Sequence, residues 1–99
     1  MKKEVSLIGS NGQVSNTEIH VSRIDGDEVV WYSNGSEAAW IVFASLDGSP
    51  FTDTKFHVPA GGSVSTGIAS KTGLTIGHPY KYTVVGKTGV NDPVIIIDN

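Results

Sequence analysis

Short stretches in which apolar and polar residues alternate recur along the whole chain. In EIHVSR, Ile19 and Val21 share one face and His20 and Ser22 share the other, as expected when successive side chains of a strand point to opposite sides. No segment carries apolar residues at helical spacing over three or four turns. The pattern therefore predicts short strands, at residues 4–8, 18–23, 28–33, 39–44, 55–58, 63–68, 80–85 and 94–97.

Turn signals and composition indicate the same fold class. The stretches SNGQ, DGD and SNGS supply Asn-Gly and Asp-Gly pairs, which tolerate the positive φ of tight hairpin turns. Val, Ile and Thr number 12, 9 and 8, against 3 Leu and 5 Ala, and β-branched side chains favour strands over helices. We therefore expect the 99 residues to form one all-β domain, 1–99, folded as a two-sheet Greek-key sandwich.

Charge and cysteine content exclude several classes of protein. The chain has no cysteine, so it can form neither a disulfide nor a thiolate metal site. Its net charge is -3 and its basic residues form no run longer than Lys2 and Lys3, so we expect no nucleic-acid partner. The longest apolar run, VIII, is too short to span a membrane, so no membrane contact is expected. The opening residues lack the apolar segment of a secretory signal, which favours a cytoplasmic chain or a mature exported domain with an added Met.

The stretch LTIGHPY has the spacing of a tyrosine corner. Leu74 is followed by Gly77 and then by Tyr80, each three residues on. In such a corner, the hydroxyl of a Tyr at the start of a strand hydrogen-bonds the backbone just upstream, where a crossover leaves backbone groups unpaired. We therefore expect a structural role for Tyr80; the alternative is a core Tyr whose hydroxyl reaches water.

Three stretches of the chain share their spacing with a known family. In WYSNGSEAAWIVF, Trp31 is followed by a turn with Asn and by an apolar strand that ends at Phe43. FHVPAGGSV reads as a strand, a turn with Pro and Gly, and a further strand. In YKYTVVGKTGVNDPVIII, Tyr80 and Tyr82 precede a loop and a closing apolar strand. This arrangement resembles that of the cupredoxins, the small blue-copper sandwich proteins, and implies a cupredoxin-like fold.

The copper ligands of that family have no counterparts in this chain. The resemblance puts Ala39 at the position of the first His, Val84 at that of the Cys, Lys87 at that of the second His and Asp92 near that of the Met. A blue-copper ion takes two imidazoles, one thiolate and a weak thioether. Ala and Val offer no lone pair, and Lys is a cation at neutral pH. The resemblance therefore implies a protein without a type-1 copper site, cofactor or catalytic residue: a non-catalytic module that binds a protein or a small ligand.

Two alternatives use other features of the chain. His20, His57 and His78 form a non-standard metal site if the fold brings them together, although alternation places His20 and His57 on outward faces. The other alternative is an Ig-like accessory or adhesion domain of a secreted protein, which the missing Cys…Trp…Cys spacing disfavours.

Two features indicate partners. Trp31 and Trp40 flank the turn SNGSEAA and, together with Asn34, form a candidate contact patch, although its apolar neighbours favour core packing for Trp31. The last strand, VIII, has apolar residues on both faces. This predicts that its outer face is covered by loops or by another chain, as in a homodimer formed through this strand.

Overall fold

The computed structural model describes residues 2–9, 11–33, 37–44, 48–69, 73–85 and 92–99. None of these residues belongs to a helix, so no helix among them could span a membrane. The strands are β1 (Lys3–Ile8), β2 (Glu18–Val21), β3 (Glu28–Ser33), β4 (Ala39–Phe43), β5 (Lys55–Val58), β6 (Ser63–Ile68), β7 (Pro79–Val85) and β8 (Val94–Ile97).

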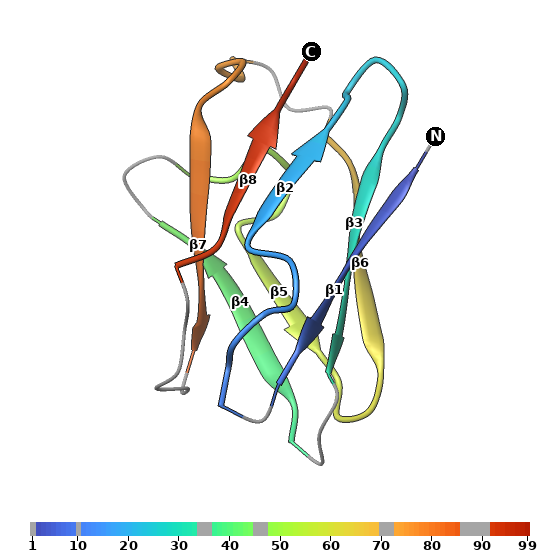
Figure 1. Ribbon diagram of the computed structural model, residues 1–99, viewed down its shortest axis with the longest axis vertical. Helices are drawn as coiled ribbons and strands as arrows, with labels where there is room; N and C mark the ends of the chain where they lie inside the picture. Colours follow the sequence, from blue (N-terminus) through green and yellow to red (C-terminus); the bar gives the residue numbers. More distant parts are fainter. Residues whose placement is uncertain (1, 10, 34–36, 45–47, 70–72, 86–91) are drawn as a thin grey trace.

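The eight strands form two sheets that pack face to face (Figure 1). One sheet has the order β1-β3-β6, and the other has the order β2-β8-β7-β4-β5. The pairs β1/β3 and β2/β8 are parallel, whereas the remaining pairs are antiparallel. The predicted all-β, two-sheet architecture is confirmed.

Alternation along the strands sorts side chains into the core, as the sequence predicts. On β7, Tyr80, Tyr82 and Val84 are buried and the residues between them are exposed. The bounds differ from the prediction most clearly at β2, which ends at Val21 rather than at residue 23. The reason is that the backbone N–H of Ser22 donates to the carboxylate of Asp27 at 2.9 Å, which starts the turn there.

An aromatic cluster around Trp31 occupies the space between the sheets. The Trp31 ring lies 5.3 Å from that of Tyr82, 5.4 Å from that of Phe56 and 6.4 Å from that of Phe43, measured between ring centroids. Phe51 extends the cluster through contacts with two of these rings. Every buried side-chain nitrogen and oxygen in the described part of the chain has a hydrogen-bond partner. No unpaired side-chain polar group in the core of the described residues therefore reduces the stability that apolar burial provides.

The last strand lies inside its sheet. β8 is hydrogen-bonded to β2 on one side and to β7 on the other, so neither edge is free to pair with another chain. Ile95 and Ile97 are fully buried, and Val94 and Ile96, on the outward face, are half-buried. A dimer through this strand could therefore use only its outward face, and the homodimer predicted from VIII stays a prediction.

Candidate functional site

The sequence positions matched to the first His and the Cys of the cupredoxins lie in the apolar core. Val84 of β7 is fully buried and pairs with Ile41 of β4. Ala39, the first residue of β4, is 2% exposed and pairs with Val58 of β5. A buried methyl and a buried isopropyl group contribute packing and no electron pair.

The remaining two positions do not supply a copper site either. Asp92 is exposed, has a φ of 53°, and its carboxylate lies 3.7 Å from the ammonium of Lys81. Lys87 lies outside the described residues. Since a blue-copper ion needs two imidazoles and a thiolate near one plane, the residues present do not fit that ion.

Trp31 is part of the core and not of the contact patch. Its side chain is fully buried, because its apolar surface packs among the other aromatic rings. The indole N–H donates to the Tyr82 hydroxyl at 3.2 Å. Burial raises the pKa of Tyr82 to about 12, although hydrogen bonds with Trp31 and Ser6 oppose the shift. The phenol is therefore protonated at neutral pH and serves as a structural hydrogen-bond partner.

Tyr80 connects the start of β7 to the chain just before it. The backbone N–H of Thr75 donates to the Tyr80 hydroxyl at 3.0 Å, and the Tyr80 side chain is 5% exposed. Leu74 packs against the core, and Gly77 has a φ of 80°, which an L side chain adopts only under strain. The backbone N–H of Gly77 also donates to the carbonyl of Ile97 at 2.9 Å. These contacts fix the corner at which the chain enters β7.

Trp40 lies on the outside of the five-stranded sheet. Its side chain is 48% exposed, and it pairs with Val85 of β7 on one side and with His57 of β5 on the other. The Trp40 and His57 rings are 4.8 Å apart, and Val85 is 50% exposed. We call Val85, Trp40 and His57 the Trp40 surface. Asn34, the third predicted member of the contact patch, lies outside the described residues.

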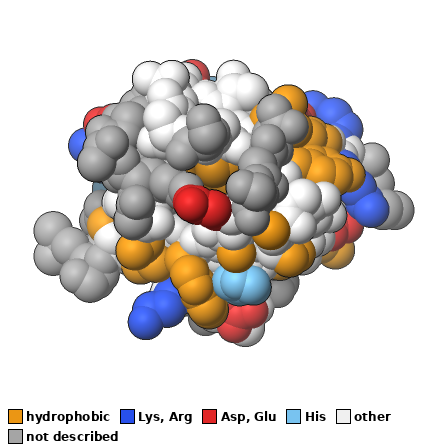
Figure 2. All heavy atoms as spheres, turned by 90° about the horizontal axis from the view of Figure 1, so that it is seen from below, with side chains coloured by type: hydrophobic (Ala, Val, Ile, Leu, Met, Phe, Trp, Pro, Cys, Tyr) orange, Lys and Arg blue, Asp and Glu red, His pale blue; other side chains and the backbone are white. Residues whose placement is uncertain are grey.

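The Trp40 surface is close to one end of the sandwich. Figure 1 shows that β4 begins and β7 ends at the bottom of the molecule, and Figure 2 looks at this end. Hydrophobic side chains gather there beside a histidine along the lower rim (Figure 2). An apolar surface next to titratable groups is a feature of protein contact sites.

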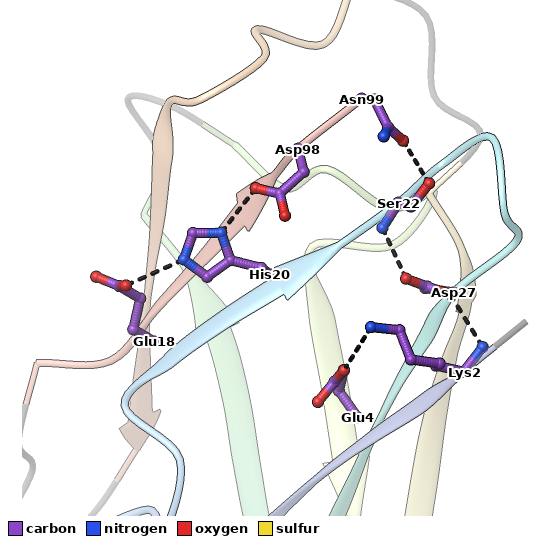
Figure 3. A network of polar contacts seen from close by, with 8 residues as sticks. All are labelled: Lys2, Glu4, Glu18, His20, Ser22, Asp27, Asp98 and Asn99. Carbon is purple, nitrogen blue, oxygen red and sulfur yellow. Dashed lines mark hydrogen bonds and ion pairs between the residues drawn. The ribbon is translucent and has the colours of Figure 1, made fainter.

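A polar cluster lies at the other end of the sandwich (Figure 3). His20 of β2 lies between two carboxylates: its Nδ1 is 2.7 Å from Asp98 and its Nε2 is 3.0 Å from Glu18. The hydrogen bond with Asp98, and then that with Glu18, raises the pKa of His20 above its ordinary value of 6.5. The imidazolium is thus stabilised, and it ties β2 to the residues that follow β8.

Asp27 anchors the turn before β3. Its buried carboxylate accepts hydrogen bonds from the backbone N–H groups of Ser22 and Lys2, each at 2.9 Å. These bonds, that from Ser22 first, hold the pKa of Asp27 below its ordinary value. The Ser22 hydroxyl donates to Asn99, and the Lys2 ammonium lies 3.7 Å from the carboxylate of Glu4. The DGD turn predicted from the sequence is therefore fixed by one of its own carboxylates.

A surface cleft of about 400 Å³ opens among the groups of this polar cluster. Four of its carboxylates are engaged with neighbours: those of Glu18 and Asp98 with His20, that of Asp27 with backbone N–H groups, and that of Glu4 with Lys2. Both nitrogens of His20 are occupied as well. The cleft is explained by contacts that hold the chain together.

The three histidines occupy different environments. His57 contacts Trp40, whereas the ring of His78 lies 5.1 Å from that of Tyr80. Among the described residues, no group of three or more His, Asp or Glu side chains could hold a metal ion. The predicted alternative of a histidine metal site has no support in that part of the chain.

Sequence reasoning missed the partners of His20 for a physical reason. Glu18 and His20 are two residues apart, so a strand puts them on one face, and this contact could have been found from the sequence. Asp98 is 78 residues away from His20 and reaches it only because β2 and β8 run in parallel. No local pattern signals that pairing.

Comparisons with known proteins identify the fold. No protein-family model matches this sequence, and no curated protein matches it. Among solved structures, a purple cupredoxin from Nitrosopumilus maritimus aligns with a TM-score of 0.65 and 13% identity, covering 95% of this chain and 98% of that one. A reduced Cu(I) form of an amicyanin mutant aligns with a TM-score of 0.62 and 15% identity, covering 95% and 80%. A pseudoazurin from Sinorhizobium meliloti aligns with a TM-score of 0.60 and 13% identity, covering 100% and 76%.

These structures resemble the chain over nearly its whole length while sharing few residues with it, so they establish the fold and nothing beyond it. The chain has no cysteine, so the thiolate of a type-1 copper site is missing. This protein has a cupredoxin-like fold that lacks the cysteine ligand of the blue-copper proteins.

Proposed function

We propose that this chain is a non-catalytic binding module that recognises an acidic protein partner through its Trp40 surface. The observation that carries the proposal is the half-exposed indole of Trp40 in a row with an exposed valine and a histidine. Large aromatic side chains on a rigid strand supply binding energy at low entropic cost, and Trp is prominent among the residues that dominate interfaces.

The charge around Trp40 indicates the chemistry of the partner. On the outward positions of β4, β5 and β7, the titratable residues are Lys55, His57 and Lys81, and none is acidic. Lys81 is partly neutralised by Asp92, but β4, β5 and β7 themselves contain no Asp or Glu. The chain as a whole carries a net charge of -3. A basic apolar surface on an acidic protein favours a partner that presents carboxylates around an apolar side chain.

The proposed role is non-catalytic because two of the groups suited to acid–base chemistry, His20 and Tyr82, are engaged in contacts that hold the fold together. Both nitrogens of His20 contact carboxylates, and the Tyr82 phenol is buried against Trp31. The described residues that the sequence resemblance matches to the family's copper ligands, Ala39, Val84 and Asp92, carry a buried methyl group, a buried isopropyl group and an exposed carboxylate. What this end of the fold offers is therefore a surface for contact.

Synthetic peptides test the proposal directly. One set places a single Phe or Leu between Asp and Glu residues, and a matched set replaces these acids with Lys. We expect the acidic set to shift the indole N–H resonance of Trp40 in NMR spectra and to bind more weakly as salt is added. Trp40→Ala should weaken binding at least about tenfold, as expected for a central aromatic anchor.

Ile76→Ala is the matched control, since Ile76 is 49% exposed and lies in the loop before β7. This variant should bind the acidic peptides as the unmodified chain does. Equal binding of both peptide sets, or binding that survives Trp40→Ala, would refute the proposed role of this surface.

A further inference from the structure

The outer face of the three-stranded sheet carries a second exposed apolar surface. Val5, Leu7 and Tyr32 are 45%, 46% and 42% exposed and lie on the neighbouring strands β1 and β3. The inward residues of β1 differ sharply from them: Ser6 and Ile8 are buried. These three side chains form a small exposed apolar surface that another molecule could cover.

Strand register orders this surface into rows. β1 and β3 are parallel, with Lys3 opposite Glu28, Val5 opposite Val30 and Leu7 opposite Tyr32. Residues opposite each other in a sheet point to the same side. Val30 is only 9% exposed, so the apolar part of these rows that reaches solvent consists of Val5, Leu7 and Tyr32. We call the six residues of these rows the β1–β3 face.

The charges of the β1–β3 face are self-complementary. Lys3 and Glu28 are the only charged residues of this face, they have opposite charges, and they lie side by side in one row. This face is therefore neutral, whereas the whole chain has a net charge of -3 and two copies repel each other elsewhere. From this geometry we propose that the β1–β3 face binds a second copy of the chain in a two-fold symmetric dimer.

The row order fixes the arrangement of the proposed dimer. A two-fold axis that runs between β1 and β3, along the strands, lays β1 of one copy over β3 of the other. Lys3 then faces Glu28 of the second copy twice, and Leu7 faces Tyr32 twice, as an isologous contact requires. An axis along β3 alone would instead stack Glu28 on Glu28, which like charge disfavours.

The size of the face sets the strength of the dimer. Two strands of six residues cover an area of roughly 10 by 20 Å, given the spacing and rise of β-strands. Each copy would therefore bury well under the roughly 800 Å² of a stable interface. The dimer is weak, with a dissociation constant on the order of 0.1 mM.

The dimer leaves the Trp40 surface open. Trp40 is on the outer face of the five-stranded sheet, on the opposite side of the sandwich from β1 and β3. A dimer would thus present two copies of that surface, and this inference does not depend on what the Trp40 surface binds.

Analytical ultracentrifugation of the full chain tests the proposal. The average mass should rise from 10.4 kDa toward twice that value as the concentration reaches about ten times the dissociation constant. Leu7→Lys should remain monomeric at the same concentrations, because it puts a charge on the apolar rows. Ile24→Lys is the matched control: Ile24 is 79% exposed and lies in the turn before β3, so this variant should dimerise as the unmodified chain does.

A charge exchange tests the arrangement itself. Lys3→Glu and Glu28→Lys should each be monomeric alone, and a mixture of the two should form a heterodimer in which both opposite-charge contacts are restored. Thermal melts verify that each variant is folded, since Glu28→Lys also loses the hydrogen bond from the Ser65 hydroxyl. A strictly monomeric unmodified chain, or Leu7→Lys that dimerises normally, would overturn the proposed dimer. A mixture that stays monomeric while the unmodified chain dimerises would overturn the two-fold arrangement.

Discussion

Two adjacent valines on β7 allow the central packing claim to be tested with matched substitutions. Val84 is fully buried and pairs with Ile41, whereas Val85, the next residue, is 50% exposed on the opposite face. Val84→Ala removes the equivalent of two methylene groups, a loss of about 1.6 kcal/mol of transfer free energy at 0.8 kcal/mol each. The enclosed cavity adds to this, so the free energy of unfolding should fall by about 2–3 kcal/mol.

Val85→Ala removes the same atoms from a half-solvated position. No enclosed cavity forms there, so we expect a loss of about 0.5–1 kcal/mol. Urea denaturation followed by the fluorescence of the buried Trp31 gives both values from midpoints and slopes. The melting temperature should fall by about 10–20 °C for Val84→Ala, since 1 kcal/mol corresponds to about 4–8 °C in a domain of this size.

Equal losses for the two variants would refute the packing account. That result would mean that residue 84 lines a solvated or loosely packed site of the kind a ligand could enter. A large loss at Val84 with a small loss at Val85 supports the prediction that residue 84, which the sequence resemblance matches to the family's Cys, fills core volume with hydrocarbon.

The remaining predictions concern a buried hydroxyl and a titrating side chain. Tyr80→Phe should lower the free energy of unfolding by about 1 kcal/mol, because the Thr75 N–H loses its acceptor. Tyr32→Phe is the control: the Tyr32 ring is exposed, so its urea midpoint should equal that of the unmodified chain. Urea midpoints that are the same in the two variants would contradict this prediction. The pKa of His20 is raised by its carboxylates, so its stabilising effect is complete below its ordinary value of 6.5 and is lost as pH rises through the folded-state pKa. His20→Gln should therefore destabilise the protein at about pH 5.5, by less than about 1 kcal/mol because the group is exposed. At about pH 8.5 the loss of stability should be smaller. A larger loss at the higher pH would contradict the prediction that the folded state raises the pKa of His20.

Much of the fold can be predicted from the sequence, because one face of each strand is buried. The alternation Ile19, His20, Val21 in β2 is enough to identify a strand and its core face. The alternation does not give the order of strands, since the parallel pairing of β2 with β8 joins segments at opposite ends of the chain. Local pattern also cannot show that the Asp27 carboxylate ends β2 by accepting the Ser22 N–H.

The candidate site was predictable to different degrees for different residues. Apolar neighbours in the sequence indicate that Trp31 belongs to the core, and burial of that indole agrees. The exposure of Trp40 could not be decided from sequence, because it depends on whether loops cover the outer face of β4. The β1–β3 face was missed for a similar reason: Val5 and Leu7 alternate with inward residues, but their exposure depends on what packs over the three-stranded sheet.

The central claim is that this cupredoxin-like chain does not bind copper. Titration with Cu²⁺, followed by visible absorption and by the melting temperature, tests it most directly. An ion that binds the folded state more tightly than the unfolded state must raise the melting temperature, by an amount set by its concentration and its dissociation constant. The account predicts no blue colour, no saturation at one equivalent and an unchanged melting temperature. Saturation at one Cu²⁺ per chain with a raised melting temperature would contradict it.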